Sequence, residues 1–302
     1  MPTPILAMIP SGFKTSKFAS VLPNDGTGDF TVVRNSSKTR VNSLGLIETL
    51  AVNVIAPDYT GGGCPVLLPE SQATNLVTYS EDIGNTGWST TRTNIDTNAI
   101  NAPDGNLTAN KAVASTANST HRVDNVISLT SANVYTFSIF AKKGEYNGIS
   151  IQIGNTSIQT NFSEFDLVNK VSNDNGTAVS AITEFSNDWL RCQVTMPSGA
   201  DDRIIIGINN VYQNQTFTGD LTSGLFLWGA QLEESSNASS YIKTTEFSAT
   251  RFADVVSINT STISGTITSI TETIDGVDQT PITAIPATYT IPVGNINKIT
   301  ME

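Results

Sequence analysis

The chain has 302 residues, of which 38% are hydrophobic and only 14% are charged, and its formal net charge is −11. This length and apolar content can build the core of one large or two ordinary domains. The acidic balance argues against a nucleic-acid partner, because phosphate contacts need a basic stripe. No apolar run reaches the length of a membrane span, so we expect neither nucleic-acid binding nor membrane insertion.

The N-terminus lacks the apolar stretch of a secretory signal peptide over residues 1–17, which predicts synthesis in a cytoplasm. The chain has two cysteines, Cys64 in a Gly-rich loop and Cys192 in a strand-like segment. Alternation places Cys192 among apolar neighbours, which indicates a small buried side chain. A reducing compartment favours two free thiols, although a disulfide stays open as the alternative.

Residues 1–70 form a polar, turn-rich lead. The stretch NDGTGD at 24–29 predicts a turn, 30–34 a short strand, and 41–54 two short strands around Gly45. So little apolar sequence would not fold alone, and we interpret the lead as a possible point of attachment.

Residues 71–254 predict a β-sandwich. Apolar and polar residues alternate in a series of short segments separated by turn clusters such as SNDNG and PSGAD, at 135–142, 149–153, 162–168, 189–196, 203–209 and 225–233. The last segment, LFLWGAQLE, is apolar on both sides: Leu225 and Leu227 face one way, and Phe226, Trp228, Ala230 and Leu232 the other. We therefore expect a central strand in an all-β, jelly-roll sandwich.

Residues 255–302 change to an alternation of Thr, Ile and Ser, with TIDGVD as a hairpin turn and Pro281, Pro286 and Pro292 behind it. Short strands of this kind bury little surface alone and invite pairing with another chain. We interpret this β-rich tail as an oligomerisation or docking element.

Several stretches resemble one family. SGLFLWGAQLE, SYIKTT and RFADV at the end of the sandwich, TNLVTYSEDIGNTGW at its start, and the lead segments SVLPNDGTGDFTVVRNSSKTRVNSLGLIE and DYTGGGCPVLLPESQATNL are similar to virion structural proteins of tailed phages, crAss-like phages among them. Those proteins are head or tail fibres or decoration subunits with a jelly roll like that of carbohydrate-binding modules. The resemblance implies a virion location, contacts with other virion proteins, a homo-oligomer of trimer type, and binding of host surface glycans.

Carbohydrate sites combine an aromatic platform with polar groups that bond hydroxyls. Trp189, Arg191 and Gln193 alternate along one predicted strand and offer such a set, and Tyr146 and Tyr212 are further candidates. The alternative is that Trp88, Trp189 and Trp228 belong to the core, as tryptophans beside sandwich strands commonly do.

Jelly rolls of this type often carry a structural Ca²⁺, and the resemblance implies that its ligands would lie near Asn75, Glu81 and Asp254, together with backbone oxygens. The alternative is that these are turn and cap residues. We expect no other cofactor.

The chain has a single histidine, His121, without a Ser or Cys partner in the sequence pattern, and its acid pairs, Glu81 with Asp82 and Asp201 with Asp202, lie beside turns. These features predict a protein that is not an enzyme. Two alternatives stay open: a purely architectural protein of a vertex, ring or portal, and an accessory module of a glycan-acting enzyme.

Overall fold

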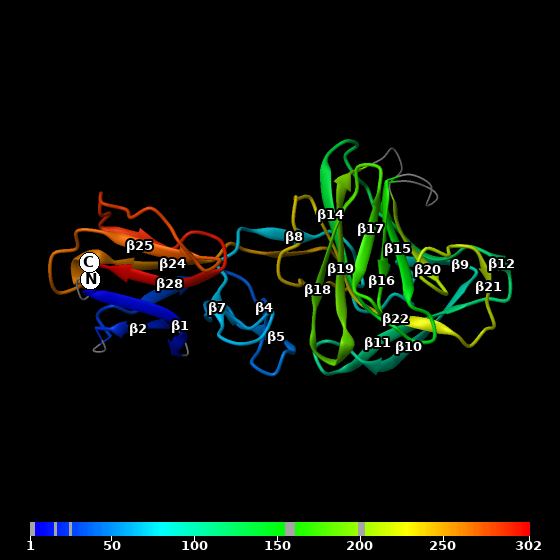
Figure 1. Cartoon of the computed structure of the whole chain (residues 1–302), viewed down its shortest axis with the longest axis horizontal. Coiled ribbons are helices and arrows are strands. Elements are labelled where there is room, and N and C mark those ends of the chain that lie inside the picture. The colour runs from blue at the N-terminus through cyan, green and yellow to red at the C-terminus, as the bar shows by residue number, and fades with distance from the viewer. Residues whose placement is uncertain (1–3, 15–16, 24–25, 155–160, 199–202) are drawn as a thin grey trace. The chain divides into compact units, whose positions relative to one another are not determined.

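The computed structural model describes residues 4–14, 17–23, 26–154, 161–198 and 203–302 (Figure 1). The chain divides into two compact units. The sandwich unit is Thr74–Ala249, and the terminal unit joins Met1–Ala73 to Thr250–Glu302. Strands dominate both units, and within the described residues the helical elements are two short 3-10 turns, Ser186–Asp188 and Thr260–Thr262. The predicted all-β class is confirmed.

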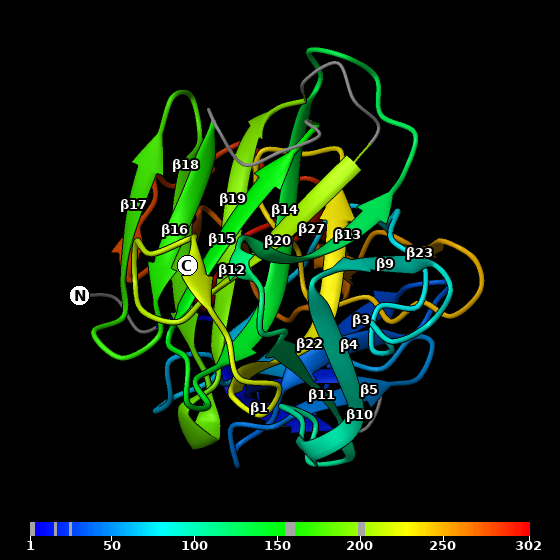
Figure 2. The same cartoon turned by 90° about the vertical axis from the view of Figure 1, so that its right-hand side faces the viewer.

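Two six-stranded antiparallel sheets make up the sandwich unit among the described residues. We name each sheet after a central strand. The β22 sheet has the spatial order β10 (Thr93–Asn101), β11 (Leu107–Ala114), β22 (Gly224–Glu233), β14 (Val134–Lys142), β19 (Leu190–Pro197) and β18 (Val179–Glu184). The β20 sheet has the order β17 (Val171–Asn175), β16 (Phe162–Asp166), β15 (Gly148–Ile153), β20 (Arg203–Asn209), β13 (His121–Val126) and β9 (Trp88–Thr91), and Figure 2 looks onto this sheet. A small ribbon pairs β12 (Asn118–Ser119) with β21 (Phe217–Thr218).

The core lies between these two sheets and follows the predicted alternation. Phe137 and Ile139 of β14, Ile151 of β15, Cys192 of β19 and Ile206 of β20 are completely buried in one cluster. Burial of this apolar surface is the main favourable contribution to folding of the unit. The jelly-roll sandwich expected from the sequence is therefore the fold of residues 74–249.

A bulge corrects the predicted orientation of β22. Gly229 has a positive φ of 65°, and the pairing of β22 with β14 shifts register there. One extra residue in a strand moves every following side chain to the other side. Ala230 and Leu232 consequently join the core with Leu227, and Trp228 lies on the outer side of the sheet.

A ten-stranded sheet organises the terminal unit within the described residues. Its order is β26 (Val277–Asp278), β25 (Ile270–Ile274), β28 (Ile296–Met301), β1 (Leu6–Lys14), β2 (Lys17–Leu22), β3 (Phe30–Val33), β24 (Val255–Asn259) and β27 (Thr288–Thr290), with β6 (Pro57–Asp58) and β7 (Val66–Leu67) attached at β28. The blue and red strands of Figure 1 are therefore neighbours. A separate hairpin pairs β4 (Lys38–Val41) with β5 (Ile47–Leu50), and β8 (Ala73–Asn75) pairs with β23 (Ala249–Arg251) where the chain passes between units.

The lead and the tail, which the sequence predicts as separate segments, share this sheet. Leu6 pairs with Met301 and Val33 with Val255, and the apolar sides of these strands form a second core. Neither segment can bury enough apolar surface alone, and the pairing of the two segments in one sheet provides that burial. The role of the tail in oligomerisation stays a prediction.

Three smaller predictions concern local features. The hairpin predicted at TIDGVD exists, with Asp275 and Gly276 between β25 and β26. Of the turn predicted at 24–29, residues 24 and 25 lie outside the described residues. Both cysteines are free: Cys64 is exposed, and Cys192 is buried in surroundings that raise the pKa of its thiol. Within the described part of the chain, no helix has the length and apolar character needed to cross a membrane.

Candidate functional site

The outward side of the β20 sheet, which we call the β20 face, carries polar residues in rows that cross the strands. One row runs through Thr91, Arg122, Gly207, Ser150, Glu164 and Asn173. The next row runs through Ser89, Asp124, Ile205, Gln152, Phe162 and Asn175. In both rows the alternate residues of the same strands point into the core, so the sandwich fixes the backbone beneath this face.

Three polar atoms of the β20 face are buried without a hydrogen-bond partner among the described residues. They are Ser150 Oγ, Asn209 Nδ2 and Asp124 Oδ1, and the three residues are at most 2% exposed. A buried polar group without a partner costs free energy, so folded chains rarely keep one. A hydroxyl, an amide donor and a carboxylate oxygen together present both donors and acceptors.

Ser150 and Asn209 are close neighbours on the sheet, and Asp124 lies further along the same face. Ser150 lies directly opposite Gly207 on β20, and Asn209 is two residues further along that strand. Such diagonal neighbours have Cα atoms about 7–8 Å apart. Asp124 on β13 lies opposite Ile205 and Ser150 on β15 lies opposite Gly207, so these two residues are two strand spacings apart across the sheet and two residues apart along β20, roughly 12 Å in all. The set therefore spans an area comparable with a small ligand.

Two arginines surround Asp124. Arg122 Nε lies 3.2 Å from Asp124 Oδ2, and Arg203 Nη1 lies 3.9 Å from the same atom. Burial raises the pKa of the Asp124 carboxyl, and this desolvation outweighs the lowering effect of the two cations. The arginine side chains remain partly exposed, at 21% and 29%, and keep donors near the face.

An aromatic side chain flanks the other end of the β20 face. Tyr212 follows β20 in the chain, and its pKa is raised by burial and by the nearby charges of Glu164, Asp166 and Asp174. The same loop reaches β16 through Gln215, whose Nε2 donates to Glu164 Oε1 at 3.0 Å. Of the five predicted sugar-binding residues, Tyr212 is the one on this side of the sandwich.

Two other aromatic candidates belong to the core region. Trp189 is 1% exposed and donates its indole N–H to the carbonyl oxygen of Asn101 at 3.2 Å. Tyr146 is 8% exposed and packs edge-on against Phe217, with 5.2 Å between ring centroids. Neither ring presents an open side, so the predicted platform of Trp189, Arg191 and Gln193 does not form. The core alternative applies to Trp88, which lies in the core between the sheets, whereas Trp228 is buried on the outer side of the β22 sheet.

Arg191 and Gln193 lie on the outer side of the β22 sheet, opposite to the β20 face. Arg191 donates to Ser138 Oγ through Nε and Nη2 and to the Ser239 carbonyl oxygen through Nη1, at 2.8–3.2 Å. Its guanidinium also lies 5.5 Å from the centre of the Phe140 ring. These contacts hold residues 239–245, which we call the exit segment, against the sheet. Gln193 is partly exposed beside them.

The predicted calcium ligands have other partners. Asn75 is fully buried: its Oδ1 accepts from Val77 N and Leu232 N, and its Nδ2 donates to Ala230 and Ile242 carbonyls. Glu81 accepts from Tyr241 Oη and pairs with Lys243 Nζ at 2.6 Å. Both belong to the sandwich unit.

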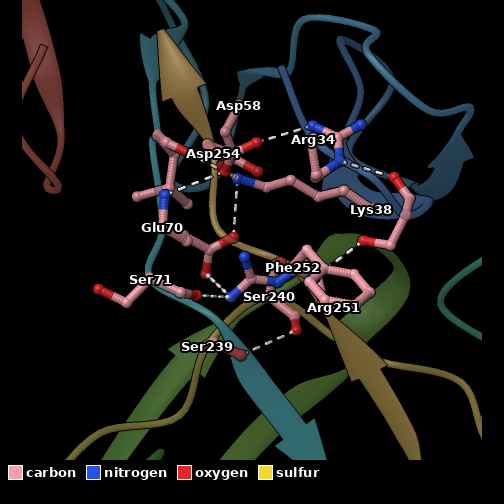
Figure 3. A network of polar contacts seen from close by, with 12 residues as sticks. Arg34, Lys38, Asp58, Glu70, Ser71, Ser239, Ser240, Arg251, Phe252 and Asp254 are labelled. Carbon is pink, nitrogen blue, oxygen red and sulfur yellow. Dashed lines mark hydrogen bonds and ion pairs between the residues drawn. The ribbon is translucent and has the colours of Figure 1, made fainter. Parts of the chain in front are cut away.

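Asp254 belongs to the terminal unit, where its carboxylate contacts Arg34 and Lys38, each at 2.8 Å (Figure 3). In the part of the chain that the structure describes, no cluster of three or more His, Cys, Asp and Glu side chains is arranged to hold a metal ion. The structure therefore gives Asn75 and Glu81 structural hydrogen bonds within the sandwich unit, and Asp254 an ionic partner set.

His121 and the acid pairs have local structural contacts where they are described. His121 is 1% exposed, with Nδ1 2.7 Å from the Arg92 carbonyl oxygen and its ring against Phe217. Asp82 is exposed and accepts from Asn85. Asp201 and Asp202 lie outside the described residues.

Comparisons with known proteins add little beyond this geometry. No family model matches the chain, and no curated protein matches it. Among solved structures, the chain is similar to xylanase 10B of Clostridium thermocellum, in its CBM22-1 and GH10 modules complexed with xylohexaose, at 11% identity and a TM-score of 0.30. The match covers 58% of this chain and 30% of that chain. A likeness this low assigns no ligand and no activity.

Sequence reasoning missed Ser150, Asn209 and Asp124. The alternation in GISIQI did place Ser150 opposite the core, but nothing local distinguishes such a serine from an ordinary exposed one. The useful signal is weak: polar residues at outward positions of strands that are otherwise isoleucine, as in RIIIGIN. Only the pairing of β13, β15 and β20 brings the three residues together.

Proposed function

We propose that this chain is a structural protein of a bacteriophage virion, a head or tail fibre or a surface decoration subunit, that displays the sandwich unit and binds host surface glycans through the β20 face. The virion assignment rests on the resemblance of the segments SGLFLWGAQLE, SYIKTT and TNLVTYSEDIGNTGW to such proteins. The glycan assignment rests on one observation: three polar atoms of the β20 face are buried without a hydrogen-bond partner among the described residues.

Sugar hydroxyls match these three atoms chemically because each hydroxyl both donates and accepts a hydrogen bond, and the groups that cover the atoms must move aside for a sugar to reach them. Ser150 Oγ can do either, Asn209 Nδ2 donates, and Asp124 Oδ1 accepts when ionised. Arg122 and Arg203 add donors at one side, and the Tyr212 ring adds apolar surface at the other. A ligand that supplies the absent partners recovers the free energy that these buried groups cost the free protein.

Assembly as a homo-oligomer, a trimer in this proposal, makes weak single sites useful. Several copies on one particle raise the effective concentration of the face at a glycan-coated surface. The terminal unit, in which the tail and the lead share one sheet, supplies the part that contacts other virion proteins.

The first test is a glycan array probed with the full chain, followed by calorimetry with each glycan that binds. The double variant Ser150→Ala with Asn209→Ala should weaken binding by about tenfold or more, since each lost hydrogen bond is worth on the order of 1 kcal/mol. The matched control is Gln193→Ala on the opposite sheet, which should bind like the parent. Equal loss in both variants, or no bound glycan at all, would contradict the glycan part of the proposal.

The virion part has its own test, cryo-electron microscopy of the whole particle. The proposal expects this chain at the surface, with the sandwich unit outward. An architectural role at a vertex, ring or portal is the main alternative, and chains enclosed between other proteins would support it. An accessory module of a glycan-acting enzyme would instead be recovered apart from particles.

A further inference from the structure

A buried ionic network in the terminal unit places a lysine amine between two carboxylates. Lys38 Nζ lies 2.8 Å from Asp254 Oδ2 and 2.8 Å from Glu70 Oε2. The side chains of Lys38, Asp254 and Glu70 are 1%, 4% and 11% exposed. Figure 3 shows the lysine side chain reaching between the two acids, so the amine and both carboxylates meet in a site from which water is largely excluded.

Two arginines complete the network. Arg34 Nη1 contacts Asp254 Oδ1 at 2.8 Å, and Arg251 Nη2 lies 3.6 Å from Glu70 Oε1. In these ion pairs, three cations contact the carboxylates of Asp254 and Glu70. A guanidinium does not lose its proton in proteins, so Lys38 is the one cation of these three that can release a proton.

The two oxygens of Asp254 are held differently. Oδ1 contacts the Arg34 guanidinium, whereas Oδ2 faces the Lys38 amine and accepts from the backbone N–H of Glu70 at 3.0 Å. A fixed positive group at one carboxyl oxygen is the arrangement that stabilises negative charge when a nucleophile adds to the carboxyl carbon. Arg34 is therefore placed to hold the oxygen that would remain, and Oδ2 is the oxygen that would leave.

We propose that Lys38 and Asp254 join in an intramolecular amide bond, with Glu70 transferring the protons. Glu70 takes a proton from the Lys38 ammonium, and the nitrogen lone pair then attacks Cγ of Asp254. A C–N bond forms, the bond between Cγ and Oδ2 breaks, and Glu70 delivers two protons from the nitrogen to Oδ2, which leaves as water. One positive and one negative charge disappear together, and no oxidant, reductant or cofactor is consumed.

Other lysine pairs in the described chain lack this setting. Lys111 Nζ lies 2.9 Å from Glu145, but that carboxylate is 56% exposed, and Lys170 and Glu184 are exposed at 44% and 62%. Water at an exposed pair favours the separated ions and hydrolysis over condensation. Among the ion pairs of the described residues, Lys38 is the lysine whose amine contacts two carboxylates.

The bond would join residues 216 positions apart, on either side of the sandwich unit in the sequence. It would close the terminal unit covalently and would persist when the protein unfolds. Cross-links of this kind act chiefly by restricting the unfolded chain, as disulfides do.

Intact-mass spectrometry of the purified full chain tests the proposal. The measured mass should fall short of the sequence mass by one water, and proteolysis should release a joined peptide containing Lys38 and Asp254. A mass equal to the linear chain, with both peptides recovered separately, would overturn the proposal without any variant.

Two variants then separate the roles. Glu70→Gln keeps the size of the side chain but removes the proton carrier, so this variant should have the full linear mass. Lys111→Arg, at the exposed pair, should still lack one water. A joined peptide in Glu70→Gln would overturn the role of Glu70, and recovery of the full mass in Lys111→Arg would overturn the choice of Lys38.

Discussion

The two outer sides of the sandwich carry similar polar residues, and they differ in the hydrogen bonds that these residues make among the described part of the chain. On the β22 sheet, Ser138 Oγ accepts two hydrogen bonds from Arg191, and the exit segment covers the aromatic rings beside it. On the β20 face, Ser150 Oγ is just as deeply buried and has no partner among the described residues.

In our proposal, the β22 side serves stability and the β20 face serves binding. Hydrogen-bonded polar groups stabilise the native state modestly, whereas buried polar groups without a partner cost stability, and a ligand that bonds to them would recover that cost. The comparison therefore predicts that substitutions on the β22 side lower stability, and that those on the β20 face lower affinity.

The largest effect on stability is expected for Trp228→Ala, on the outer side of the β22 sheet. Trp228 is 1% exposed and packs against Tyr241 and Phe140, with ring centroids 4.7 and 5.5 Å apart. Removal of a buried tryptophan costs about 3–5 kcal/mol of the free energy of unfolding. Urea denaturation measures this loss. A loss below about 1 kcal/mol would mean that the exit segment does not secure this side.

A matched pair of serines sharpens the comparison. Ser138→Ala leaves the Arg191 donors without their acceptor and should cost about 1–3 kcal/mol. Ser150→Ala removes a hydroxyl that has no described partner and should be neutral or slightly stabilising, within about 0.5 kcal/mol. Urea denaturation of both variants under one condition compares their losses in the free energy of unfolding. Equal losses would show that the two sides do not differ as argued.

The smallest effect concerns pH. Burial raises the pKa of Asp124, so the folded state favours its protonated form. The contribution of this group to stability is complete below the ordinary carboxyl pKa and is lost as pH rises through the raised folded value. Asp124→Asn should therefore melt above the parent at neutral pH, and the difference should shrink as pH falls below the ordinary carboxyl range. A constant difference across that range would contradict the assignment.

The strands and much of the core could be predicted from the sequence, because alternation is a local property. Phe137, Ile151 and Cys192 face inward as their neighbours indicate. The same reasoning placed Ala230 on the wrong side, because the extra residue at Gly229 inverts the alternation. A glycine within a strand is not enough to predict a bulge from the sequence.

Long-range pairing could not be predicted from local patterns. The neighbourhood of Leu6 and Met301 joins the two ends of the chain, and nothing in either segment specifies the other. The candidate site has the same origin, since Asp124, Ser150 and Asn209 come from three strands. The sequence predicts Trp189 as a sugar-binding platform because it is an aromatic residue in an alternating segment. The structure shows instead that its ring is buried and that its indole N–H bonds to the Asn101 carbonyl oxygen.

The most direct test of the central claim is a crystal structure of the full chain with a glycan selected on the array. We predict the sugar on the β20 face, with hydroxyls bonded to Ser150, Asn209 and Asp124 and a ring near Tyr212. A sugar bound instead beside Arg191 and Gln193, on the outer side of the β22 sheet, would contradict the account.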